Sequence, residues 1–71
     1  MTEPHLTDMD KLAHLLEHWR EHNDEHAANY ESWADKAARA GHKETAALLR
    51  QAAQATQQIS DLFSRAKKAI K

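Results

Sequence analysis

The sequence predicts an all-α protein, an antiparallel two-helix hairpin that dimerises into a four-helix bundle. One Gly and one Pro in 71 residues, among many Ala, Leu, Glu, Lys, Arg and Gln, favour helix over strand. Two stretches repeat apolar residues in steps of three and four, the period of a helix packed along its length. Gly41, the only glycine, separates these stretches. Two helices joined by so short a turn must run antiparallel.

The first helix is expected over residues 7–40. Thr7 precedes the first periodic apolar residues and has Asp10 three positions on, a pair that resembles a capping box. Residues 1–6 are expected to form a flexible N-terminus before the single helical domain, residues 7–71. We expect one seam of this helix, largely apolar but polar in its middle, to face the second helix. Its members are Leu12, Leu16, Trp19, Asn23, His26, Tyr30, Trp33 and Ala37.

A turn is expected at residues 41–43 and the second helix at residues 43–70. Gly41 can adopt the left-handed conformation that commonly ends a helix. The second helix carries an apolar stripe that is expected to face the first helix. Its members are Thr45, Leu48, Ala52, Ala55, Ile59, Leu62, Ala66 and Ala69, and Leu49, Thr56, Phe63 and Ile70 broaden it. Its alanines should let the second helix approach closely beneath Trp19 and Trp33.

The short length of the chain and the width of its apolar stripes predict a homodimer. A lone core is marginal at 71 residues, and the absence of Cys excludes disulfides. Each stripe is wider than one partner helix can cover, so a second hairpin is the economical solution. Which helix faces form the dimer interface stays open.

Composition and motifs argue against several function classes. Ten basic and eleven acidic residues nearly cancel, so nucleic acid is not expected as a partner. No stretch approaches the ~18 apolar residues of a membrane span, and the first residues lack a signal-peptide pattern, so we expect no membrane partner and a cytoplasmic location. Catalytic and cofactor motifs are also missing, which predicts a non-enzyme without an organic cofactor. A di-iron bundle enzyme is a minor alternative, because the Glu-x-x-His order of such sites is reversed here.

A row of histidines is the most informative feature of the sequence. His14, His18, His22 and His26 recur at every fourth residue, and Glu25 follows His22 by three. Residues four apart lie about 6 Å apart on one helix face, close enough for two imidazoles to share a metal ion. Neutral imidazole suits nickel, zinc, copper and cobalt, of which we expect nickel, zinc or copper. With no thiolate available, the ligand set would be His with carboxylate or water.

The histidine row winds around the helix, since a four-residue step overshoots one turn by about 40°. One ion therefore cannot take all four imidazoles from one chain. The sensible pairs are His18 with His22 or His22 with His26. The set would be completed by Glu25, by a residue of the second helix, or by the matching pair of a second chain. A two-chain site would link metal binding to dimerisation.

A second interpretation needs no metal. The repeated polar tetrads would be a solvated face, and His26 with Asn23 would only fix the register and oligomeric state of a bundle. The protein would then be a structural module that docks a protein partner. His5 and His42 are expected to be incidental under both interpretations.

The run from His14 to Ala27, HLLEHWREHNDEHA, followed by Tyr30, Trp33-Ala34 and Gly41-His42-Lys43-Glu44, resembles a small and mostly uncharacterised family of helical hairpins. The resemblance extends from about Leu12 to Ile70. Some members are associated with nickel-accessory proteins, so it implies a metal-related role. This chain lacks the His-rich tract of such fusions, which leaves a stand-alone assembly role open. The matching positions are His14, His18, Trp19, Glu21, His22, Asn23, Glu25, His26 and Trp33.

We therefore expect a small non-catalytic protein that binds a divalent transition metal in storage, delivery or sensing. Its ligands would come from His14, His18, His22, His26 and Glu25. The alternative is a dimeric interaction module without metal.

Overall fold

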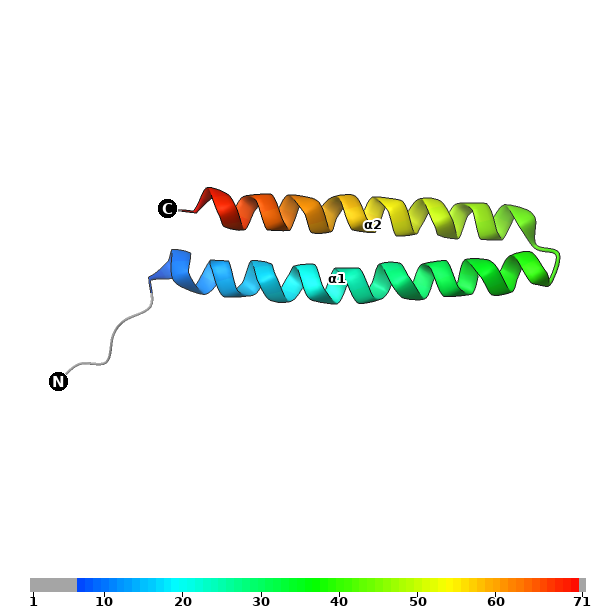
Figure 1. Ribbon diagram of the computed structural model, residues 1–71, viewed down its shortest axis with the longest axis horizontal. Helices are drawn as coiled ribbons and strands as arrows, with labels where there is room; N and C mark the ends of the chain where they lie inside the picture. Colours follow the sequence, from blue (N-terminus) through cyan, green and yellow to red (C-terminus); the bar gives the residue numbers. More distant parts are fainter. Residues whose placement is uncertain (1–6, 71) are drawn as a thin grey trace.

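The computed structural model describes residues 7–70 as two helices, α1 (Asp8–Arg39) and α2 (Lys43–Ala69). The helices lie side by side and run antiparallel, so α1 begins at the end of the hairpin where α2 finishes (Figure 1). Residues 7–70 contain no strand. The predicted all-α hairpin is confirmed. The predicted flexible N-terminus, residues 1–6, lies outside the described residues.

Both ends of α1 have the local structure that the sequence predicts. The Thr7 hydroxyl accepts a hydrogen bond from the Asp10 backbone N–H (3.1 Å), and the Asp10 carboxylate accepts one from the Thr7 N–H (3.0 Å). At the other end Gly41 has a φ of +91°. The N–H groups of Gly41 and His42 donate to the carbonyls of Ala38 and Ala37, which is a Schellman motif. The capping box and the glycine turn are both confirmed.

Small side chains fill the contact between the helices. Buried apolar residues are Leu16, Ala27, Ala34, Ala46 and Ala53. On α1 the contact therefore follows Leu16, Ala27 and Ala34, and the two alanines each lie one residue beyond a member of the predicted seam, His26 and Trp33. Trp19 is 40% exposed and Trp33 is 59% exposed, so neither tryptophan is buried between the helices, and Trp19 packs against Phe63 of α2. Alanine occupies these positions because its small side chain lets the two helix backbones approach closely.

The contact face of α2 is likewise shifted from the predicted stripe. Ala46, Ala53 and Ser60 are buried, with Leu49 and Thr56 half-buried between them and Phe63 half-buried beyond Ser60. The residues expected to broaden the stripe thus form part of the contact. The predicted stripe itself, from Thr45 to Ala69 in steps of three and four, is exposed throughout.

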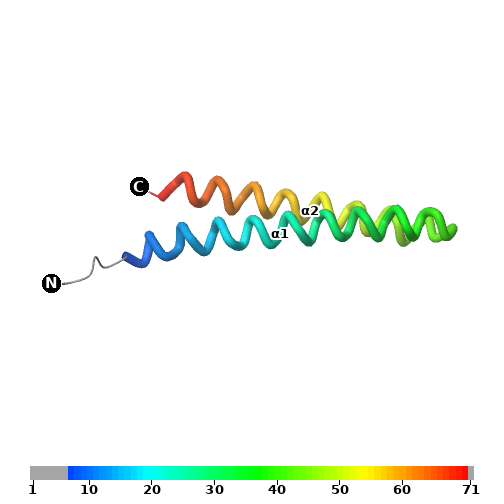
Figure 2. The backbone as a smooth tube through the Cα atoms, turned by 60° about the horizontal axis from the view of Figure 1, so that its bottom comes forward, coloured from blue at the N-terminus to red at the C-terminus, as the bar shows by residue number. Residues whose placement is uncertain are grey.

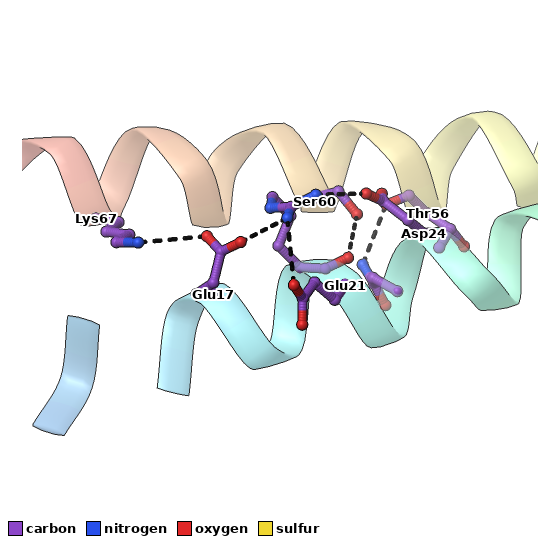
Figure 3. A network of polar contacts seen from close by, with 8 residues as sticks. Glu17, Glu21, Asp24, Thr56, Ser60 and Lys67 are labelled. Carbon is purple, nitrogen blue, oxygen red and sulfur yellow. Dashed lines mark hydrogen bonds and ion pairs between the residues drawn. The ribbon is translucent and has the colours of Figure 1, made fainter. Parts of the chain in front are cut away.

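The middle of the contact between α1 and α2 is polar, as predicted. The Asn23 side-chain amide donates to the Thr56 carbonyl at 3.1 Å, and the Ser60 hydroxyl lies 3.5 Å from the Arg20 carbonyl (Figure 3). Each bond joins a side chain to the backbone of the facing helix, so a slip of either helix would break both. Asn23 therefore fixes the register of α1 on α2 within one chain.

The hairpin is one layer of helices thick. Figure 2, turned by 60° from Figure 1, shows that the two helices cross at a small angle and that no third element covers either face. The principal-axis extents of the Cα atoms are 63 × 22 × 11 Å. Within residues 7–70, neither helix has the length and apolar character that crossing a membrane requires.

Candidate functional site

Four aromatic rings contact one another in a row along α1, which we call the ladder. His18, His22, His26 and Tyr30 are spaced four residues apart, so each ring lies above the next on the helix surface. The centroids of His18 and His22 are 6.2 Å apart, those of His22 and His26 are 4.5 Å apart, and those of His26 and Tyr30 are 6.0 Å apart. His26 and Tyr30 are half-buried, whereas His18 and His22 are exposed. The ladder is therefore half-buried at its Tyr30 end and exposed to solvent at its His18 end.

The closest contact in the ladder joins His22 to His26. Their Nε2 atoms are 3.1 Å apart, and the rings are nearly perpendicular at 84°. Two imidazole nitrogens that bind one zinc ion at about 2.0–2.1 Å in a tetrahedral site lie about 3.3 Å apart. The observed separation therefore suits two ligands of a shared ion. It also suits an N–H···N hydrogen bond when one ring donates and the other accepts.

The other predicted ligands do not join this pair in one chain. Within residues 7–70, no three His, Cys, Asp or Glu side chains are arranged to hold a metal ion together. His14, His18 and Glu25 are all exposed. One chain therefore brings two imidazole nitrogens together, and further ligands would have to be water molecules or groups of another chain.

Acidic residues follow the flank of α1 away from the tryptophans, and several of them pair with bases. Arg20 lies 2.6 Å from Glu17 and 2.7 Å from Asp24 (Figure 3). Two further ion pairs cross to α2, Glu17 with Lys67 at 3.4 Å and Asp35 with Arg50 at 2.9 Å. The hydrogen bond from Arg20, and then that from Lys67, lowers the pKa of the Glu17 carboxyl below 4.5. The charges of these side chains keep this flank of the hairpin exposed to solvent.

The opposite face of the hairpin is apolar. Trp19 packs against Phe63 with ring centroids 5.8 Å apart, which places the Trp19 side of α1 and the Phe63 side of α2 on one face. Six large apolar side chains, each at least 40% exposed, define what we call the apolar face. They are Leu15, Trp19, Trp33, Leu48, Ile59 and Leu62.

Charges are nearly absent from the apolar face. The α2 stripe from Thr45 to Ala69 holds no Asp, Glu, Lys or Arg, although 30% of the chain is charged. The α1 stripe of this face differs from the predicted seam and comprises Leu12, Leu15, Trp19, His22, His26, Asn29, Trp33 and Lys36. It has one charged residue of these four types, Lys36, whose ammonium lies 4.3 Å above the Trp33 ring. His26 belongs to this stripe and lies midway between Trp19 and Trp33. The histidine pair thus borders the apolar face.

The four-residue spacing predicts that His22 can pair with His26, but it does not predict two features of the site. Tyr30 belongs to the predicted seam, and its ring also stacks on His26. The apolar face contains both tryptophans of the predicted α1 seam and three residues of the predicted α2 stripe, whose spacing predicts contact within one chain. Its signal was present in the sequence, because each helix carries two neighbouring apolar stripes and only one of them can face the other helix.

Comparison with known proteins identifies a family. Residues 12–70 match the model of a domain of unknown function, DUF8180. An uncharacterized protein of Archaeoglobus fulgidus is 38% identical over 58 residues, which cover 82% of this chain and 92% of that protein. No solved structure matches the chain. The expected membership of a small, uncharacterised family is confirmed, whereas an association with nickel stays a prediction. The chain belongs to the DUF8180 domain family.

Proposed function

We propose that this protein is a non-catalytic metal-binding hairpin that takes a divalent transition metal ion through Nε2 of His22 and Nε2 of His26. The observation that carries the proposal is the 3.1 Å separation of these two nitrogens. Imidazole is a ligand for nickel, zinc and copper alike, so all three are candidates. The biological role would be metal storage, delivery or sensing.

The ring ladder supports the proposal because it restricts the ligands before any metal arrives. Tyr30 is half-buried and stacks on His26 at an interplanar angle of 18°. His18 stacks on His22 from the other side at 14°. Side chains held in this way lose less conformational entropy when they bind, and preorganised ligands therefore bind more tightly. Tyr30 and His18 are positioning residues in this account.

A second candidate function is that of a protein-interaction module without metal. The apolar face favours it, because a contiguous exposed apolar patch marks an interaction site. Under this alternative the His22–His26 contact is only a hydrogen bond on the surface of α1. The two functions differ in what the removal of one imidazole does to metal affinity.

Calorimetric titration of chelator-treated protein with Ni²⁺, Zn²⁺ and Cu²⁺ tests the proposal. His22→Gln and His26→Gln each remove one proposed ligand and keep a polar side chain of similar length. His14→Gln is the matched control, since His14 is exposed on the same helix and lies outside the ladder.

The proposal predicts micromolar or tighter binding of at least one of these ions by the native protein and by His14→Gln. Affinity should fall at least tenfold in each of the other two variants, while the helical circular dichroism stays unchanged. Millimolar binding by the native protein, or equal affinity in all three variants, would contradict the proposal and favour the interaction module.

A further inference from the structure

The hairpin keeps its smallest apolar side chains inside and its largest ones outside. Among residues 7–70, Leu16 is the largest apolar side chain buried between the helices, and the other four buried apolar residues are alanines. The apolar face meanwhile exposes two tryptophans, three leucines and one isoleucine. Large apolar side chains are normally the first to be buried, so this distribution indicates a protein whose main core forms only when something covers the apolar face.

The size of the apolar face equals that of a standard protein interface. At ~1.5 Å per residue the helices overlap over about 40 Å, and two helices side by side are about 20 Å wide. The face is therefore about 800 Å², the area that each partner contributes to a typical stable complex. It is about one seventh of the 5666 Å² surface of the chain. A second hairpin has a face of matching length and width.

Four of the six large side chains of the apolar face are spaced symmetrically about one level of the hairpin. Trp19 and Trp33 each lie seven residues from His26. On α2, Leu48 and Leu62 each lie seven residues from Ala55.

His26 and Ala55 also lie at about the same height. Trp19 contacts Phe63, and seven residues forward from Trp19 correspond to seven residues back from Phe63 in an antiparallel pair, which is Thr56, the neighbour of Ala55. A two-fold axis perpendicular to both helices at this height would place each stripe of one copy against the same stripe of the other copy.

We propose that a second copy of this chain covers the apolar face, related to the first by a two-fold axis that crosses the helices at the level of His26 and Ala55. In this arrangement α1 packs antiparallel on the partner's α1, and α2 packs antiparallel on the partner's α2. Trp19 then packs beside the partner's Trp33, and Leu48 beside the partner's Leu62. The result is a four-helix bundle whose core holds the large side chains.

The distribution of charge agrees with pairing of two identical faces. A contact between copies buries no carboxylate, because neither stripe of the face carries one. Its single cation, Lys36, lies over Trp33 and can keep its ammonium at the rim. The acidic flank, with Glu17, Asp24 and Asp35 in ion pairs, points away from the contact. The opposite face therefore stays in water, and assembly stops at two copies.

The axis also completes the metal site, a step that rests on the proposed function. Because His26 lies at the level of the axis, the His22–His26 pairs of the two copies meet there. Each pair supplies two nitrogens, so the dimer offers four imidazole ligands, the number that a tetrahedral zinc site takes. The arrangement predicts one ion for two chains.

Cysteine cross-linking of metal-free protein tests the dimer separately from the metal. The chain has no native Cys, so a single introduced thiol reports alone. Ala55→Cys places the thiol at the axis, where a disulfide with the same residue of the partner is within reach. Ala69→Cys, on the same stripe, places the thiol about 21 Å from the axis, so the thiols of the two chains would be about 42 Å apart. Ala47→Cys, three residues before Arg50, places it beside the ion-paired flank.

The expected result is a native mass of two chains in chelator and rapid oxidation to a covalent dimer for Ala55→Cys, at least tenfold faster than for either control variant. A monomeric mass, or equal cross-linking of the three variants, would overturn the inference. The two proposals can fail separately. Cross-linking at Ala55 by a protein that binds no metal would refute only the proposed function, whereas metal binding by a monomer that does not cross-link would refute only this inference.

Discussion

Replacing Leu62 with Ala measures directly whether the apolar face is covered. In a single hairpin Leu62 is 55% exposed, so its truncation removes only about half of the transfer free energy of a buried leucine, about 1 kcal/mol. In the dimer the same side chain is buried against the partner, and Leu→Ala in a packed core costs about 2–5 kcal/mol per site. Because the dimer contains two such sites, the loss per dimer is twice as large. Leu16→Ala is the reference, since Leu16 is only 6% exposed within one chain.

Urea unfolding followed by helical circular dichroism over a hundredfold range of protein concentration gives the comparison. We expect Leu62→Ala to lose nearly as much stability per chain as Leu16→Ala. We also expect the midpoint of the native protein to rise with concentration, because unfolding separates the two chains. A loss of about 1 kcal/mol or less for Leu62→Ala, with a midpoint independent of concentration, would refute the claim that the apolar face is covered.

Four further predictions concern the cap, the polar contacts and the metal site. Thr7→Ala removes the hydroxyl that accepts the Asp10 N–H hydrogen bond of the capping box. The free energy of unfolding in urea should fall by about 1 kcal/mol, and amide exchange in the first turn of α1 should become faster. Asn23→Ala removes the donor to the Thr56 carbonyl and should also cost about 1 kcal/mol; an unchanged midpoint would show that this bond does not hold the register. Because Arg20 lowers the pKa of Glu17 in the folded chain, the stabilising contribution of this carboxylate is present above pH 4.5 and is lost as the pH falls through the lowered pKa. Melting curves of Glu17→Gln should therefore lose this part of the acid dependence. Metal affinity should fall as the pH is lowered, because protons compete with the metal ion for the imidazole nitrogens; calorimetry at several pH values checks this.

The ends of the helices could be predicted from the sequence because each depends on a local signal. Thr7 and Asp10 form the capping box within one turn of chain. Gly41 is the one residue without a side chain, and it holds the positive φ at the turn. Neither feature depends on what the rest of the chain contacts, so residue type and spacing were enough.

The face of each helix that contacts the other could not be predicted in the same way. On α1 the stripe through Trp19 and Trp33 lies one residue from the stripe through Ala27 and Ala34, and both have heptad spacing. If the more hydrophobic stripe is chosen, the stripe with the tryptophans is predicted to face α2. The fold instead places the alanines between its helices, because small side chains allow the closer approach of two backbones. Periodicity alone does not distinguish a face that meets its own chain from one that meets another chain.

The histidine pair could be predicted only in part from the sequence. The four-residue spacing predicted that neighbouring imidazoles would lie on one side of α1. It left open whether His22 pairs with His18 or with His26. In the structure the Nε2 atoms of His22 and His26 lie 3.1 Å apart, which favours this pair, while the ring of His18 also stacks on that of His22. Ring orientation depends on contacts that spacing does not contain.

Native mass spectrometry of chelator-treated protein, titrated with Ni²⁺ or Zn²⁺, tests the central claim most directly, because it counts chains and ions in one particle. The account predicts a dimer without metal and, at micromolar metal, two chains with one ion, a species that His26→Gln should not form. A particle that binds no ion at these concentrations, or a monomer that binds its own ion, would contradict the claim that paired histidines of two copies form the site.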